Sequence, residues 1–226
     1  MTREIVIDTE TTGLNPLTGD RVVEIGGVEL FNHIPTGRHF HKYINPERQM
    51  ASDAFSVHGL SDEFLRDKPR FAEIADELLE FIGDAPLVAH NAEFDMRFLN
   101  AELASLKRAT IALDRAVDTV RLARQRFPGA PASLDALCKR FAIDNTQRTL
   151  HGALLDAQLL AEVYLQLLGG PQTGLSLTSA AEEAARTALN VIGRIIRPAR
   201  PHAASAEELA AHSAFIAKLK DAVWLS

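Results

Sequence analysis

Short runs rich in valine and isoleucine mark the first part of the chain and predict β-strands. Residues 4–9 (EIVIDT) form such a run and lead into acidic residues, which is consistent with a buried central strand. Residues 22–31 and 38–44 predict the next two strands of a meander, and residues 86–90 (PLVAH) predict a short buried strand. The chain therefore begins as a sheet.

Apolar residues at helical spacing follow these strands. Residues 71–82 place apolar side chains at 71, 74, 75, 78, 79 and 82, the pattern of an amphipathic helix. Asn91 can cap a helix that runs to about residue 106, and Ser133 can cap a short helix to about residue 141. Residues 152–168 are strongly helical. Strands first, then strand–helix alternation, predict an α/β fold in which helices flank a mixed sheet.

The pattern changes after residue 168, where Gly169, Gly170 and Pro171 end the last helix. The following stretch is rich in Ala, Ser and Thr, and Ser205 and Glu208 then have the spacing of a capping box. We predict a folded domain over 1–170, a flexible linker over 171–204 and a short helical tail over 205–226. A helix this short is not stable alone, so we expect it to fold against a partner.

Composition narrows the class of protein. The 226 residues are 46% hydrophobic and 24% charged, as in an ordinary globular chain, with a net charge of −6. This acidity argues against a protein that grips nucleic acid by charge alone. One cysteine excludes a disulfide framework, and no apolar run approaches the length of a membrane span. We expect a cytoplasmic protein with no membrane contact.

Candidate chemistry begins at Asp8 and Glu10, two residues apart at the end of the first predicted strand. At this spacing both carboxylates leave the same face of the strand and repel each other unless a cation or a proton lies between them. A hard divalent ion such as Mg²⁺ suits such ligands. The alternative is a pair of solvated acids. The turn at Thr11, Thr12 and Gly13 offers backbone N–H groups that could hold a phosphate.

Two further acids and a histidine complete the candidate set. Asp95 lies in the first turn of its helix, where an acid also suits the helix dipole. Asp156 lies among leucines, where an unpaired carboxylate is costly, so it is the stronger metal-ligand candidate. His151 precedes Asp156 by five residues, which does not stack on a helix face, so we expect it to enter from the preceding loop as a general base.

Three segments, DTETTG at 8–13, HNAEFDMRFL at 90–99 and HGALLDA at 151–157, resemble in that order the three motifs of the DEDDh family of 3′→5′ exonucleases. The connecting segments of residues 3–170 resemble the proofreading subunits of bacterial DNA polymerase III. The resemblance implies a ribonuclease-H-like fold with a mixed five-stranded sheet. It implies that the enzyme releases deoxynucleoside monophosphates from DNA 3′ ends.

The resemblance also implies the site. Asp8, Glu10 and Asp156 would hold two Mg²⁺ or Mn²⁺ ions with help from Asp95, and His151 would take a proton from the attacking water. Family members hold the terminal nucleotide with the segment that matches 53–59, so Asp53 and His58 carry over as substrate-binding candidates. Asp53 stands where the longer Glu is expected.

The carboxy-terminal part implies protein partners. Gln172, Leu175 and Leu177 resemble the short peptide that binds the bacterial β sliding clamp. EELAAH at 207–212, with Trp224, resembles the segment that binds the α (polymerase) subunit, whereas the plain alternative is a tail without a partner. A small theta-like subunit, present in some bacterial polymerase cores, is a further candidate partner.

Two other functions stay open: a ribonuclease of the same chemistry that trims RNA ends, and a catalytically inactive assembly subunit.

Overall fold

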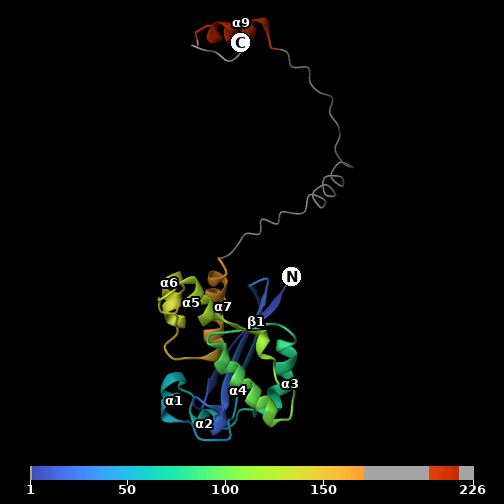
Figure 1. Ribbon diagram of the computed structural model, residues 1–226, viewed down its shortest axis with the longest axis vertical. Coiled ribbons are helices and arrows are strands. Elements are labelled where there is room, and N and C mark those ends of the chain that lie inside the picture. Colours follow the sequence, from blue (N-terminus) through green and yellow to red (C-terminus); the bar gives the residue numbers. More distant parts are fainter. Residues whose placement is uncertain (1, 171–203, 219–226) are drawn as a thin grey trace, which may run out of the picture. The chain divides into compact units, whose positions relative to one another are not determined.

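The computed structural model describes residues 2–170 and 204–218, and it contains the predicted mixed sheet (Figure 1). Five strands lie in the order β3-β2-β1-β4-β5, with β1 antiparallel to β2 and parallel to β4. Antiparallel β3 and parallel β5 form the two edges. The strands are β1 (Arg3–Thr11), β2 (Val22–Phe31), β3 (Ile34–Tyr43), β4 (Leu87–Ala89) and β5 (Ala116–Asp118).

Helices cover both faces of the sheet (Figure 1). On one face α3 (Phe71–Ile82) and α4 (Ala92–Ser105) share a buried cluster with Ile5 and Ile7 of β1. On the other face α6 (Leu134–Phe141) and α7 (Ala153–Leu167) share a second cluster with Val6. The side chains of β1 thus alternate between the two layers, as a strand buried on both faces requires.

Two predicted caps had different outcomes. Ser133 caps α6 as predicted, because its hydroxyl accepts a hydrogen bond from the N–H of Ala136. Asn91 does precede α4, but its side chain makes no capping bond and its backbone is left-handed (φ 68°). Instead, its N–H donates to Asp118 Oδ1 at the end of β5 (3.1 Å). The predicted side-chain cap is therefore wrong, because a contact with the neighbouring strand fixes this turn.

Several short elements have no signal in the sequence pattern. These are β5, α1 (Ser52–His58), α2 (Asp62–Leu65) and α5 (Thr119–Arg126). Strand β3 also starts at Ile34 rather than 38, because the left-handed residues Asn32 and His33 turn the chain tightly after β2. Elements as short as these often show too little periodicity to predict from one sequence.

The carboxy-terminal segment contains α9 (Ala206–Ile216). It begins with the predicted capping box: Ser205 Oγ accepts from the N–H of Glu208, and Glu208 Oε2 accepts from the N–H of Ser205. Residues 172–177 and Trp224 lie outside the described residues. Over 2–170 and 204–218, every helix is too short or too polar to cross a bilayer.

Candidate active site

Asp8 and Glu10 lie at the carboxyl end of β1 and belong to the face that packs against α7. Two earlier residues of the same alternation show this: Val6 lies in the α7 cluster, and Glu4 Oε1 accepts a 2.7 Å hydrogen bond from the hydroxyl of Tyr164 in α7. A register shift follows directly after Glu10. The prediction that both carboxylates leave one face is thus confirmed.

Gly26 brings the start of α7 to these acids. It lies opposite Asp8 in the β1–β2 pairing. A Cβ atom at this position would lie 2.2 Å from the carbonyl carbon of Ala153 in the first turn of α7. Only a glycine permits the helix to lie this close to the sheet. The close approach places Asp156, in the same turn, beside the end of β1.

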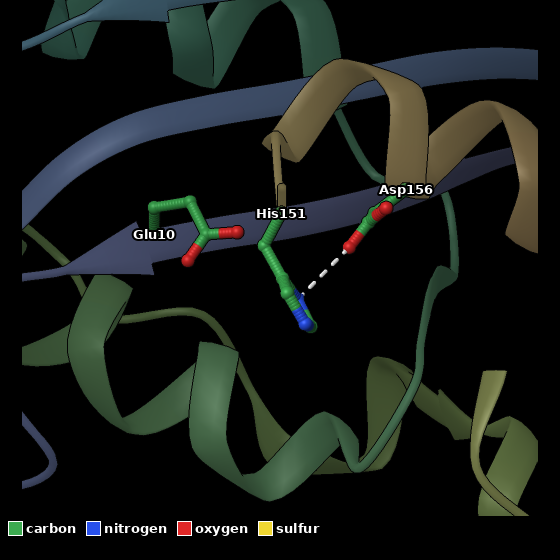
Figure 2. Close-up of side chains that lie close together, drawn as sticks. All are labelled: Glu10, His151 and Asp156. Carbon is green, nitrogen blue, oxygen red and sulfur yellow. Dashed lines mark ion pairs between the residues drawn. The ribbon is translucent and has the colours of Figure 1, made fainter. Parts of the chain in front are cut away.

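Three side chains from separate segments meet at this point (Figure 2). Ligand atoms of Glu10, His151 and Asp156 all lie within 4.8 Å of one another. His151 Nδ1 lies 3.3 Å from Asp156 Oδ2, and the backbone N–H of His151 donates to the carbonyl of Val57 in α1 (3.1 Å). His151 therefore enters from the loop before α7, as predicted.

Asp95 reaches the site from the α4 side of the sheet. It lies in the first turn of α4 and is buried. Its Oδ1 accepts a 2.7 Å hydrogen bond from the hydroxyl of Thr9. Burial raises the pKa of Asp95 to about 7, although this hydrogen bond lowers it. The carboxyl group is thus held between β1 and α4, where its charge raises the pKa values of Asp8 and Glu10.

Neighbouring carboxylates disfavour the charged forms of Asp8 and Glu10. Burial, and then the charges of Asp95, Glu10 and Asp156, raise the pKa of Asp8 well above its usual range. Burial raises the pKa of Glu10 to about 8, against an opposing effect of His151. Crowded carboxylates with raised pKa values favour either protons or a hard cation. This donor set therefore fits divalent metal ions.

Arg148 is a residue of the site to which the sequence pattern assigned no role. Its Nε and Nη2 donate to the two carboxylate oxygens of Asp156 at 2.6 and 2.7 Å, and its Nη1 donates to Asp135 Oδ1 at 2.9 Å. Its Nη2 also lies 2.9 Å from His151 Nδ1. Burial alone would raise the pKa of Asp156, but hydrogen bonds from Arg148 and His151 lower it.

A cleft of about 440 Å³ adjoins the acids. Glu10 lies in its wall, and Asp53 and His58 of α1 line it with the apolar side chains of Leu14 and Phe94. His58 Nδ1 accepts a hydrogen bond from the N–H of Leu60 (3.0 Å), which places the ring proton on Nε2. This buried Nε2 has no hydrogen-bond partner among the described residues. Burial lowers the pKa of His58, although a contact with the backbone of Thr11 opposes this shift.

The structure thus brings most predicted site residues together. Glu10, His151 and Asp156 form the centre, with Asp8 and Asp95 adjoining. Asp53 is exposed and lines the neighbouring cleft with His58. Gln172, Leu175 and Leu177 lie outside the described residues.

Comparisons with known proteins identify chains similar to this one. The family model described as exonuclease matches residues 5–164. The DNA polymerase III subunit epsilon of Rickettsia felis (strain ATCC VR-1525 / URRWXCal2) is 50% identical over 227 residues, which cover 96% of each chain. Its counterpart in Escherichia coli (strain K12) is 49% identical over 224 residues, or 95% of this chain and 92% of that one.

Solved structures are similar over the folded domain. Exonuclease X in complex with 5′ overhanging duplex DNA has a TM-score of 0.57 and 28% identity. The nuclease domain of 3′hExo, a DEDDh family member bound to rAMP, has a TM-score of 0.63 and 17% identity, and this likeness concerns the fold alone. Each comparison covers 74% of this chain and 91% of the other.

Proposed function

The chain belongs to the exonuclease family, at about 50% identity to epsilon subunits of bacterial DNA polymerase III, and from this premise we propose how its residues act. Its fold is the ribonuclease-H-like exonuclease fold that the sequence predicts. Its function is that of a proofreading 3′→5′ exonuclease in bacterial DNA replication. The residue roles that follow are our proposal.

We assign the metal site to the carboxylate cluster. Asp8, Glu10 and Asp156 would hold two divalent cations, Mg²⁺ or Mn²⁺, and Asp95 would support them. The supporting observation is the convergence of buried carboxylates with raised pKa values at one end of β1. When bound, the ions lower the pKa of a coordinated water and stabilise negative charge on the phosphate.

His151 serves as the general base. Its imidazole is half exposed and lies at the edge of the cluster, within reach of a water molecule beside Glu10 and Asp156. The hydrogen bond to Asp156 raises the pKa of His151, although burial and the charge of Arg148 oppose this. An imidazole with a raised pKa accepts a proton from the attacking water and retains it during cleavage.

The cleft receives the 3′-terminal nucleotide. His58 offers a buried Nε2–H that can donate to an oxygen of the nucleotide, and this bond would satisfy a donor that otherwise lacks a partner. Leu14, Val57 and Phe94 provide apolar surface for the base and the sugar. Asp53 lies at the exposed edge of the cleft, where it can accept a hydrogen bond from the sugar.

The choice between DNA and RNA rests on the relatives. The protein relatives reported above are DNA replication subunits, and exonuclease X was solved with duplex DNA. The 3′hExo domain was solved with rAMP, but the lower identity makes it a guide to fold only. We therefore propose DNA 3′ ends as the substrate and deoxynucleoside 5′-monophosphates as the product.

The carboxy-terminal segment connects the nuclease to its replication partners in this proposal. Residues 1–170 form the nuclease domain. In the linker 171–204, the clamp-binding peptide contains Gln172, Leu175 and Leu177 and binds the β sliding clamp. Residues 205–226 bind the α subunit. In α9, Leu209 and Phe215 expose 56% and 62% of their surface, which supports a partner-binding role. A theta-like subunit remains a candidate third partner. Because its relatives are DNA replication subunits, we place the chain in the cytoplasm. We further propose that it works at the nucleoid.

Two experiments test these assignments. Asp8→Ala and Asp156→Ala should abolish metal-dependent release of monophosphates from a mismatched DNA 3′ end, and near-normal activity in either variant would disprove the metal-site assignment. Deletion of 205–226 should preserve nuclease activity but abolish copurification with the α subunit. Persistent copurification would locate that contact elsewhere.

A further inference from the structure

The cleft beside the acids has two walls that come from different parts of the chain. Gly13 and Leu14 belong to the loop between β1 and β2. Ala51, at the start of α1, and Asp53 belong to the opposite wall. The contacts that fix the distance between these walls also set the space for a terminal nucleotide.

Asp20 packs against the loop that forms the first wall. Its Oδ2 accepts from the N–H of Asn15 at 3.0 Å, and its Oδ1 accepts from the hydroxyl of Thr12 at 3.3 Å. A Cβ atom added to Gly13 would lie only 2.4 Å from Asp20 Oδ2. The carboxylate therefore packs directly on the backbone of Gly13, a contact that any larger residue there would displace.

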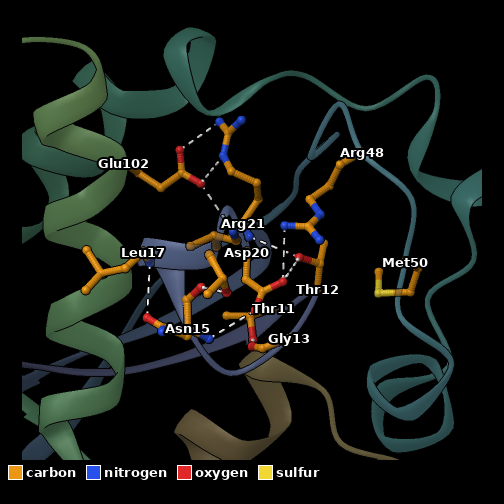
Figure 3. A network of polar contacts seen from close by, with 12 residues as sticks. Thr11, Thr12, Gly13, Asn15, Leu17, Asp20, Arg21, Arg48, Met50 and Glu102 are labelled. Atoms are coloured by element: carbon orange, nitrogen blue, oxygen red, sulfur yellow. Dashed lines mark hydrogen bonds and ion pairs between the residues drawn. The ribbon is translucent and has the colours of Figure 1, made fainter.

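Arg48 joins Asp20 to the second wall (Figure 3). Its Nη1 lies 3.1 Å from Asp20 Oδ1. The two side chains are 35% and 14% exposed, so solvent screens the pair only in part. Arg48 precedes Ala51 by three residues, and neither Asp20 nor Arg48 lines the cleft itself. The ion pair thus links both walls from outside the substrate space.

Arg21, at the end of the same loop just before β2, is fixed by contacts that do not involve Arg48. It donates to both carboxylate oxygens of Glu102 in α4, at 2.7 and 2.8 Å (Figure 3). Its backbone N–H also donates to the hydroxyl of Thr12 (3.0 Å). Because these bonds fix the base of the loop, the contact with Arg48 acts mainly on the part near Gly13 that faces the cleft.

We propose that Asp20 and Arg48 are positioning residues that set the width of the cleft for the 3′-terminal nucleotide. This inference rests on the proposed function of the cleft. Because the pair touches neither the carboxylate cluster nor the nucleotide, its loss should weaken substrate binding and leave the chemical step largely intact. Metal binding should not change, since the cluster lies on β1 and α7.

The test uses the full-length chain and two readouts. Arg48→Ala should raise KM for a single-stranded DNA 3′ end, and the Kd for thymidine 5′-monophosphate with Mg²⁺, by about tenfold, as a misplaced binding group does. The kcat should stay within about threefold, since a loss of binding shared by ground state and transition state raises KM alone. Arg48→Lys should restore most of the binding, because an ammonium group can also form an ion pair with Asp20. Asp20→Ala in the Arg48→Ala background should weaken binding further, because it also removes the hydrogen bonds that Asp20 accepts from Asn15 and Thr12.

A matched control is Asp76→Ala, which breaks the exposed ion pair between Asp76 and Arg108, away from the cleft lining. It should leave KM and the monophosphate Kd unchanged. If Asp20→Ala fails to fold, the two Arg48 variants carry the test, with thermal melting and Mg²⁺ binding as checks on the fold.

The outcomes separate this inference from the function on which it rests. If the wild-type protein does not bind the monophosphate, the assignment of the cleft fails. If the wild type binds it and Arg48→Ala binds it equally well, the role of the ion pair is disproved. A loss in kcat with unchanged KM, or no rescue by Arg48→Lys, would also overturn it.

Discussion

Arg148 occupies both carboxylate oxygens of Asp156, with two hydrogen bonds of 2.6 and 2.7 Å. The side chains of both residues are almost fully buried, at 7% and 4% exposure. This guanidinium places a positive charge directly against the carboxylate of Asp156. A cation that binds Asp156 therefore competes with Arg148 for the same carboxylate oxygens.

We predict that Arg148→Ala destabilises the metal-free protein and increases the stabilisation by Mg²⁺. Removal of one partner from a buried ion pair costs about 3–5 kcal/mol, because the other charge is left uncompensated. Thermal melting with EDTA and with a series of Mg²⁺ concentrations measures both effects. Arg108→Ala, which breaks an exposed pair, is the control and should change neither quantity appreciably. Weaker metal stabilisation in Arg148→Ala would mean that Arg148 orients Asp156 for the metal instead.

The pH dependence of stability should report the carboxylate cluster. The pKa of Glu10 is raised to about 8, so at pH 6 the folded protein holds a proton that the unfolded chain lacks. Stability of the metal-free protein therefore falls as pH rises toward about 8, where this proton is lost. Urea unfolding in EDTA between pH 6 and 8.5 should show this fall.

Glu10→Gln is the matched control for that experiment, because it keeps the shape and removes the titration. It should have a flatter profile than the wild type over the same range. Added Mg²⁺ should stabilise the wild type more at pH 8 than at pH 6, since protons and metal compete for the same oxygens. Identical profiles for the two proteins would show that Glu10 does not carry the raised pKa.

Gly26 should be essential for the site, although it carries no functional group. Gly26→Ala forces a methyl group into the backbone of α7 and should cost about 1–3 kcal/mol, with loss of metal binding as α7 moves away from β1. Gly27→Ala is the control on the opposite face, where a methyl group meets side chains instead, the ring of Phe81 at 2.9 Å and Cβ of Phe40 at 3.5 Å. Retention of wild-type metal binding in Gly26→Ala would contradict the proposed role of this close approach.

His151→Ala should lower kcat by about 10²- to 10⁴-fold, the usual cost of losing a general base. Metal-induced stabilisation should persist, since the carboxylates remain. Rates of monophosphate release at saturating DNA, with melting curves beside them, separate the two effects. A decrease of less than tenfold would show that another group takes the proton.

The sequence predicts the acids of the site better than their supports. Asp8, Glu10 and Asp156 are visible because a carboxylate that interrupts an apolar pattern requires an explanation. Arg148 lies in a polar loop where an arginine is ordinary, and only the fold reveals its contact with Asp156. Asp20 and Arg48 are likewise distant in sequence and meet through loops without periodicity. Strand β5 has three residues and is defined by its pairing with β4, which no local pattern encodes.

The most direct test of the whole account compares three substrates in one assay: a primer with a mismatched 3′ end, the matched primer and an RNA of the same sequence. With Mg²⁺, we predict stepwise release of deoxynucleoside 5′-monophosphates from DNA, fastest at the mismatched end, and no release by Asp8→Ala. Faster trimming of the RNA, or undiminished release by Asp8→Ala, would contradict the assignment of a proofreading exonuclease that acts through this carboxylate centre.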